Sequence, residues 1–296
     1  MKSRSKLWFG VGAFVLVGSE SSPALATEQV VQGPVASSGA EILRLALGNH
    51  SRSMLRLAQA WTLGAGEAGE AGEGGEAGIN VEAAEKDPVE YRIALQVMAA
   101  HFHAGLAAYE GSEKEAGAQM FAHGLSEVYV EMEEVFKRRG VTTLGKTLEA
   151  AVEAATAGKP VADVRRRVKD VYAALLAAEK AAPKSQGPVQ AVKAQVVAEM
   201  IERAAAQFAV VQKDAASLEP YLDGLGFAIS ARNEARAVLP WLRKVDAQKE
   251  KALSKALAMT AEVYPGIKRP SAAKVSVPDL LAAASGAKLA VSGLLK

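Results

Sequence analysis

The sequence contains no cysteine, and aromatic residues make up only 5% of its 296 residues. The absence of cysteine excludes a disulfide framework, a thiolate metal site, an iron–sulfur cluster and a cysteine nucleophile. An excess of one charge is also lacking, because 35 basic residues stand against 33 acidic ones. Nucleic-acid-binding chains normally carry a basic excess, so we expect no nucleic-acid partner. The hydrophobic residues are mostly Ala, Leu and Val, which favours helices.

Long apolar runs are absent after the N-terminus, so we expect no membrane span in the mature chain. At the N-terminus, Lys2, Arg4 and Lys6 precede an apolar stretch of 12 residues at 7–18, and the small residues of 23–26 follow. This order is typical of a secretory leader with its cleavage site. We therefore predict a signal peptide over residues 1–26 and a soluble protein of the periplasm. The rival interpretation is an uncleaved N-terminal anchor.

Glycine, proline and capping residues divide the rest of the chain into predicted helices. Their ranges are 40–61, 88–109, 113–139, 143–157, 160–182, 188–214, 217–245, 247–264 and 277–295. Asp87-Pro88 is a start signal for the second of these, and 112–115 has the pattern of a capping box for the third. No segment has a convincing strand pattern. We predict an all-α fold, an antiparallel multi-helix bundle, because most connections are short. It would consist of an N-terminal helical region, 27–140, and a C-terminal helical bundle, 141–296.

Residues 64–78 have no helical pattern and repeat Gly-Glu-x. They include a literal GxGxxG at 64–69. A dinucleotide-binding loop follows a strand and turns no carboxylates toward the pyrophosphate, and neither condition holds here. We expect a flexible, acidic Gly/Glu-rich loop between two helices. The alternative is a mobile carboxylate lid that attracts cations to a nearby site.

Residues 140–147 match the P-loop pattern GxxxxGK[ST]. That loop needs a buried strand leading into it, so that backbone amides face the phosphates at the start of a helix. Here the preceding segment, 133–139, has the composition of a charged helix end. Gly140 is better explained as the C-cap of that helix. No nucleophile–base pair is evident elsewhere, so we expect no enzymatic activity.

Two histidines fall at matching levels of the hairpin over residues 88–139. His101 lies ten residues before Gly111 and His123 lies twelve residues after it. At about 1.5 Å per residue, both lie roughly 15–18 Å from the turn and nearly level across the antiparallel pair. His103 falls on the opposite side of its helix, where we expect it to be solvated.

A polar stripe continues from one of these histidines. It has spacings of three and four residues and consists of Met120, His123, Glu127, Glu131 and Glu134. An imidazole with several carboxylates is an array that helical bundles use for iron or manganese. The pairs Met98/His101 and Met120/His123 suggest copper instead, because thioether sulfur is a soft ligand. A plainer alternative is that the stripe faces water and the methionines pack in the core.

Two segments near the C-terminal side resemble helices of exported iron-uptake proteins. The stretch 200–208, followed by 219–227, is similar to a unit in the periplasmic extension of high-affinity iron permeases. Tyr221, Asp223 and Phe227 match its Glu-Tyr-x-acid-x-x-x-Phe pattern, although a proline stands between the glutamate and the tyrosine here. The resemblance adds Asp223 to the candidate ligands.

The histidine hairpin is similar in style to imelysin-like helical iron-binding proteins. It departs from them because their His-x-x-Glu motif is absent and the spacing here is His123-x-x-x-Glu127. Together the two resemblances cover about 140 residues and imply an iron-linked role in the periplasm.

The leading hypothesis is a soluble periplasmic helical protein that binds a transition metal for uptake or storage. Iron is the expected metal and copper the alternative. The candidate ligands are His101, His123, Glu127, Glu131, Met98, Met120 and Asp223. The second hypothesis is a non-catalytic scaffold that binds another envelope protein and no metal.

Overall fold

The structure is a computed structural model that describes residues 78–214 and 217–295. The predicted signal peptide, the predicted helix 40–61 and the GxGxxG pattern lie outside these residues, as does the Gly/Glu-rich loop up to residue 77. The described residues belong to one compact unit. Helices on both sides of residue 140 are therefore part of the same body.

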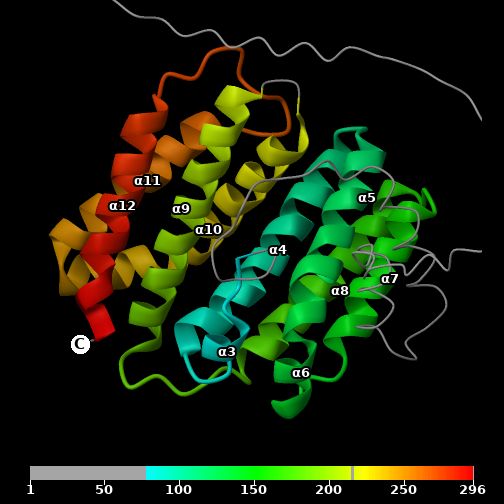
Figure 1. The fold of residues 1–296 in the computed structure, drawn as a ribbon, viewed down its shortest axis with the longest axis horizontal. Coiled ribbons are helices and arrows are strands. Elements are labelled where there is room, and N and C mark those ends of the chain that lie inside the picture. Colours follow the sequence, from blue (N-terminus) through cyan, green and yellow to red (C-terminus); the bar gives the residue numbers. More distant parts are fainter. Residues whose placement is uncertain (1–77, 215–216, 296) are drawn as a thin grey trace, which may run out of the picture. The chain divides into compact units, whose positions relative to one another are not determined.

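Every regular element of the described residues is a helix (Figure 1). The α-helices are α3 (Val81–Ala84), α4 (Pro88–Glu110), α5 (Lys114–His123), α6 (Val130–Arg138), α7 (Leu144–Thr156), α8 (Val161–Glu179), α9 (Val189–Lys213), α10 (Glu219–Val245), α11 (Ala247–Val263) and α12 (Val277–Ser292). A π-helical turn, Gly124–Tyr129, joins α5 to α6, and a short 3₁₀ turn, Gly293–Leu295, follows α12. The prediction of an all-α multi-helix bundle is confirmed. No described helix has both the length and the apolar character needed to cross a membrane.

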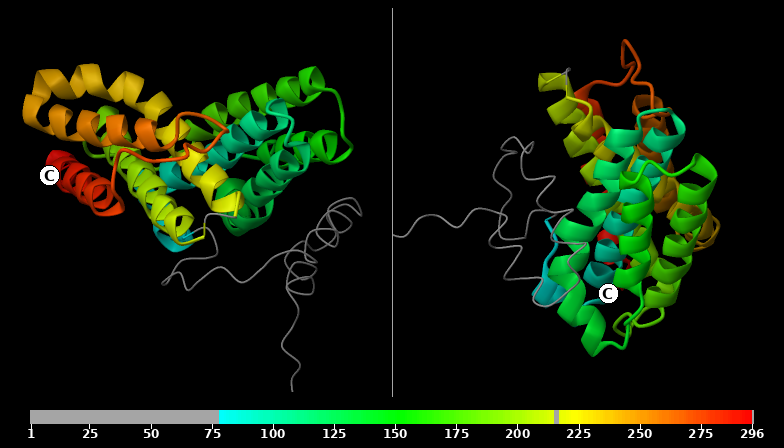
Figure 2. Two further views of the ribbon diagram at one scale, coloured as in Figure 1. Left: turned by 90° about the horizontal axis from the view of Figure 1, so that it is seen from above. Right: turned by 90° about the vertical axis from the view of Figure 1, so that its right-hand side faces the viewer.

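Helix α4 is the centre of the packing. It contacts α5 and α8 on one side and α9 and α10 on the other (Figures 1 and 2). Its sequence is apolar on nearly all faces, as expected for a helix that is covered all round. Tyr91, Met98 and Phe102 are fully buried members of the core. Residues on every side of α4 can therefore face a neighbouring helix.

The two ends of α4 test the capping residues that the sequence predicts. Asp87 caps its start as predicted, because its carboxylate accepts a hydrogen bond of 2.7 Å from the Val89 amide. The predicted capping box of the next helix is wrong: Ser112 has φ +74° and the N-cap is Glu113, without a side-chain capping bond. The reason is the preceding helix end. The Glu113 amide donates to the Ala108 carbonyl, which closes α4 and requires the left-handed conformation at Ser112.

The predicted continuous helix 113–139 is interrupted by the π-helical turn Gly124–Tyr129. Gly124 packs closely against α4, since a Cβ there would lie 3.1 Å from the Phe102 ring and 3.2 Å from the Cβ of His101. A π turn accommodates one more residue than an α turn. The side chains of α6 are therefore rotated by about 100° from the positions that a regular helix would give them.

Gly140 ends α6, as predicted. It has φ +74°, its amide donates to the Lys137 carbonyl, and the Val141 amide donates to the Phe136 carbonyl. This pair of bonds is the Schellman arrangement of a helix C-terminus. The segment before Gly140 is thus a helix rather than a strand, which removes the structural context that a P-loop requires.

Candidate metal centre

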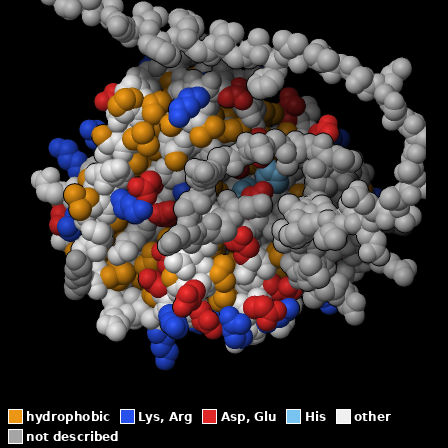
Figure 3. Space-filling view, viewed as in Figure 1, with side chains coloured by type: hydrophobic (Ala, Val, Ile, Leu, Met, Phe, Trp, Pro, Cys, Tyr) orange, Lys and Arg blue, Asp and Glu red, His pale blue; other side chains and the backbone are white. Residues whose placement is uncertain are grey.

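Three side chains from two consecutive helices and the π-helical turn that follows them meet at one point. His101 lies on α4, His123 at the end of α5 and Glu127 in the π-helical turn. Each offers a possible ligand atom, and these atoms lie within 4.8 Å of one another. The two imidazole rings are 6.2 Å apart, so the histidines are level across the hairpin as predicted. Histidine and acidic side chains lie together on this face of the molecule (Figure 3).

The surroundings of His101 determine which of its ring nitrogens can bind a ligand. Its Nδ1 lies 3.0 Å from the Val97 carbonyl oxygen, which can only accept, so Nδ1 carries the proton and donates it. Nε2 then has a free electron pair. The side chain is 6% exposed. Burial, with the nearby His123 ring, lowers the pKa of His101 to about 3, so the ring is neutral at pH 7.

Helix α10 brings a carboxylate to this free nitrogen. The Oδ1 atom of Asp223 lies 3.6 Å from Nε2 of His101, and it is buried without a hydrogen bond. Burial raises the pKa of Asp223 well above its usual value, and the carboxylates of Glu127 and Glu219 raise it further. The raised pKa favours the protonated carboxyl, whereas the ionised form places two electron-pair donors face to face in a poorly hydrated place. A cation between them would satisfy both.

The outer part of the cluster surrounds His123. Its Nδ1 lies 3.6 Å from an oxygen of Glu127 and 3.7 Å from an oxygen of Glu219. The exposed fraction of the side chain rises from 26% at Glu127 to 60% at Glu219. An ion could therefore approach along Glu219 and reach the buried Asp223 and His101 at the inner end.

The spacings suit shared coordination. Two ligand atoms bound to one ion at about 2.1 Å lie about 3.4 Å apart in tetrahedral geometry. Three histidine–carboxylate pairs in this cluster are 3.6–3.7 Å apart, and the ligand atoms of His101, His123 and Glu127 all lie within 4.8 Å of one another. Two imidazoles with a carboxylate are a donor set typical of non-haem iron(II), and zinc accepts the same set.

The sequence analysis did not include Glu219 among the candidate ligands. The available signal was its spacing from Asp223, because residues four apart lie on the same face of a helix. The sequence alone does not say which helix that face meets.

The remaining predicted ligands lie elsewhere. Met98 and Met120 are fully buried in the hydrophobic core, where packing accounts for them. Glu131 lies on α6 beyond the π-helical turn, and its Oε2 is buried. It is not in the group of three whose ligand atoms converge. The rotation introduced by the π-helical turn accounts for its displacement.

The expectation that His103 is solvated is wrong. Its Nδ1 lies 2.7 Å from the Tyr172 hydroxyl and its Nε2 lies 3.3 Å from Nδ2 of Asn233. Burial lowers the pKa of His103 to about 4. The side of α4 opposite His101 is covered by α8 and α10, which helical rotation alone does not reveal.

Close packing of α10 on α4 holds the two halves of the cluster together. Gly226 faces the Ala100 carbonyl so closely that a Cβ there would overlap it. The next residue, Phe227, packs edge-on against the His101 ring at 6.2 Å. The Arg203 guanidinium lies 6.0 Å from the Phe227 ring and donates a 2.9 Å hydrogen bond to the Gly78 carbonyl. The end of the predicted Gly/Glu-rich loop is thus connected to the neighbourhood of His101.

Comparison with known proteins gave no match: no family model, no curated protein and no solved structure matches this chain.

Proposed function

We propose that this chain is an exported helical protein that binds a transition-metal ion, with iron as its metal, through His101, His123, Glu127 and Asp223. The observation that carries the proposal is the meeting of the His101 Nε2 electron pair with the buried Oδ1 of Asp223, 3.6 Å apart and without a hydrogen bond at the carboxylate oxygen. A structural His–Asp pair would form a hydrogen bond at a normal distance. Glu219 would act at the entrance.

Iron is favoured over copper by the donor set. Neutral imidazole and carboxylate ligands suit iron(II), whereas copper(I) prefers thioether sulfur. The two methionines of the copper alternative are accounted for by core packing. The candidate ligands of the described residues form a single small group, which favours uptake or transfer of an ion over storage of a mineral core.

The test is calorimetric titration of the full chain, stripped with a chelator, with iron(II) under anaerobic conditions and with manganese(II), zinc(II) and copper(II) in parallel. We expect one iron(II) per chain with a Kd below about 100 μM. The His101→Ala/His123→Ala variant should lose this binding. Glu134→Ala is the matched control, because Glu134 belongs to the predicted stripe but is 68% exposed and pairs with Lys137.

Two outcomes would overturn the proposal. One is the absence of any metal binding tighter than about 100 μM. The other is equal binding by the double-histidine variant. If that variant does not fold, Asp223→Asn takes its place, since it preserves side-chain shape. A metal-free protein that captures another envelope protein would support the scaffold hypothesis instead.

Export is a separate part of the proposal, supported by the leader pattern at residues 1–26. Fractionation of cells that express the full chain, followed by sequencing of the N-terminus, tests it. We expect the protein in the periplasmic fraction, beginning at Thr27. An intact N-terminus in the membrane fraction would contradict cleavage.

A further inference from the structure

A cavity of about 300 Å³ lies among helices α4, α8, α9 and α10. Neither His101 nor Asp223 lines it. His103 does, and because it follows His101 by two residues it points to the other side of α4, about 200° round the helix. The cavity is therefore a place distinct from the candidate metal centre.

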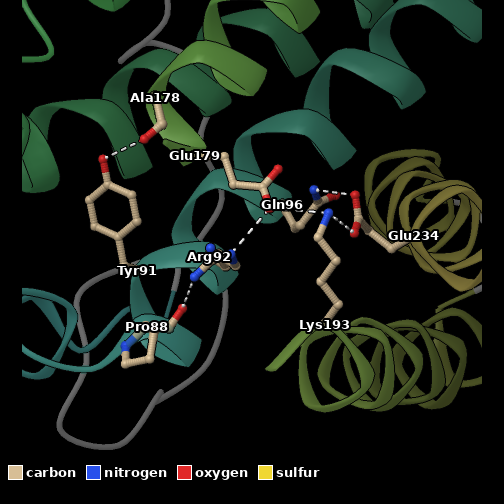
Figure 4. A network of polar contacts seen from close by, with 8 residues as sticks. All are labelled: Pro88, Tyr91, Arg92, Gln96, Ala178, Glu179, Lys193 and Glu234. Atoms are coloured by element: carbon tan, nitrogen blue, oxygen red, sulfur yellow. Dashed lines mark hydrogen bonds and ion pairs between the residues drawn. The ribbon is translucent and has the colours of Figure 1, made fainter. Parts of the chain in front are cut away.

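Side chains of both charges line this cavity and form a chain of contacts (Figure 4). Nε of Arg92 and Nζ of Lys193 lie 3.2 and 3.1 Å from the same Glu179 oxygen. Lys193 also lies 3.2 Å from Glu234, which accepts a 3.1 Å hydrogen bond from Gln96. The two cations and two anions balance, so the wall carries both signs and no net charge. Each of the four side chains keeps 13–21% of its surface exposed.

One end of the cavity is polar and uncharged. With Nδ2 of Asn233 donating to Nε2 of His103, Nδ1 of His103 carries the ring proton and donates it to the Tyr172 oxygen. The Tyr172 hydroxyl hydrogen then remains available to a ligand. The other walls are apolar and consist of Leu95, Ala99, Leu175 and Val196.

We infer that this cavity binds a small zwitterion with an apolar body, of the size of an aliphatic amino acid. Its carboxylate would meet Lys193 and Arg92, its ammonium group would meet Glu179 and Glu234, and its aliphatic part would contact the apolar walls. The volume is at the small end of ligand pockets, which excludes larger ligands. Small-molecule binding sites are usually lined by apolar side chains together with a few convergent polar groups.

The experiment is calorimetric titration of the full chain with L-leucine and with two analogues of the same body. Isoamylamine lacks the carboxylate, and isocaproate lacks the ammonium group. We expect L-leucine to bind at least tenfold more tightly than either analogue, since each charged group forms charge-assisted contacts only when it is present.

Two variants locate the binding. Ala99→Phe fills the cavity without removing a charge, and Glu234→Gln removes one anion and preserves shape. Both should weaken L-leucine binding at least tenfold, whereas Leu289→Ala, which alters an exposed residue of α12, should not change it. If circular dichroism shows that Ala99→Phe does not fold, the Glu234→Gln variant alone tests whether L-leucine binds in this cavity.

The inference is overturned if L-leucine binds no more tightly than its analogues. It is equally overturned if none of the three binds at about 10 mM, or if Glu234→Gln binds L-leucine as the unaltered chain does.

Discussion

Replacing Asp223 by Asn separates a metal ligand from a structural carboxylate. In the metal-free protein, Oδ1 of Asp223 is buried without a hydrogen bond, 3.6 Å from the free electron pair of His101. Asn has the same shape and no charge, and its amide can donate to that electron pair. We therefore expect Asp223→Asn to stabilise the metal-free protein at pH values at which Asp223 is ionised, although it removes a predicted ligand.

The size of the gain follows from the cost of an unsatisfied buried group, about 1–3 kcal/mol. Removing about 2 kcal/mol of this cost raises the melting temperature by about 4–8 °C in a domain of this size. Iron should have the opposite effect, because it should stabilise the unaltered chain more than the Asp223→Asn variant. At an iron concentration of about 100 times the Kd, binding stabilises the unaltered chain by about 2.7 kcal/mol, and a hundredfold loss of affinity reduces this to about 0.4 kcal/mol.

The assay is thermal unfolding followed by circular dichroism, with and without iron(II), under anaerobic conditions. Without metal, Asp223→Asn should melt at the higher temperature, and with iron it should gain less than the unaltered chain. Asp170→Asn, on the exposed side of α8, is the matched control and should change neither value. A lower melting temperature of metal-free Asp223→Asn would refute the reasoning, because Asp223 would then be a stabilising partner of His101.

Further measurements test the packing and the charges. Gly226→Ala should destabilise the protein by about 1–3 kcal/mol in urea unfolding and weaken iron binding, because its Cβ would push α10 away from Ala100 on α4; unchanged stability would contradict this close approach. Burial raises the pKa of Glu179, but Lys193 and Arg92 lower it by more, so the net pKa lies below its usual value. Its stabilisation is then present above the unfolded pKa of about 4.3 and is lost as the pH falls through the folded value. Glu179→Gln should accordingly cost about 1–2 kcal/mol at pH 7 and less as the pH falls below 4, and a constant difference from pH 7 to pH 3 would count against it. Removing metal with a chelator should lower the melting temperature without loss of helical circular dichroism, since a continuous hydrophobic core packs the helices; loss of the helical signal would show that the fold needs its metal.

The helices could be predicted closely because their ends depend on local chemistry. Asp87, Gly140 and Gly158 mark boundaries that the structure keeps, through a side-chain cap at Asp87 and left-handed glycines at the other two. The level histidines followed from the rise of a helix alone. The π-helical turn could not be predicted, because it depends on the close packing of Gly124 against α4.

The candidate centre was predictable only in part, because it too depends on packing between helices that are distant in the sequence. His101, His123 and Glu127 lie on one hairpin, so helical spacing relates them. Glu219 reaches them through α10, about a hundred residues later in the chain, and spacing within one helix carries no information on that contact. His103 was misjudged because a polar residue on the far side of a central helix can face neighbouring helices as well as water.

The division of the cluster between α4–α5 and α10 has a consequence for folding kinetics. The candidate ligands on α4–α5 and those on α10 are separated by about 90–120 positions, so an unfolded chain rarely presents the complete set together. A cation bound there would have little affinity for the unfolded chain and would stabilise only the state in which α10 has docked. If docking of α10 comes after the transition state, the ion lowers the unfolding rate and leaves the folding rate unchanged. The benefit to the cell would then be a longer lifetime of the folded protein in the presence of proteases.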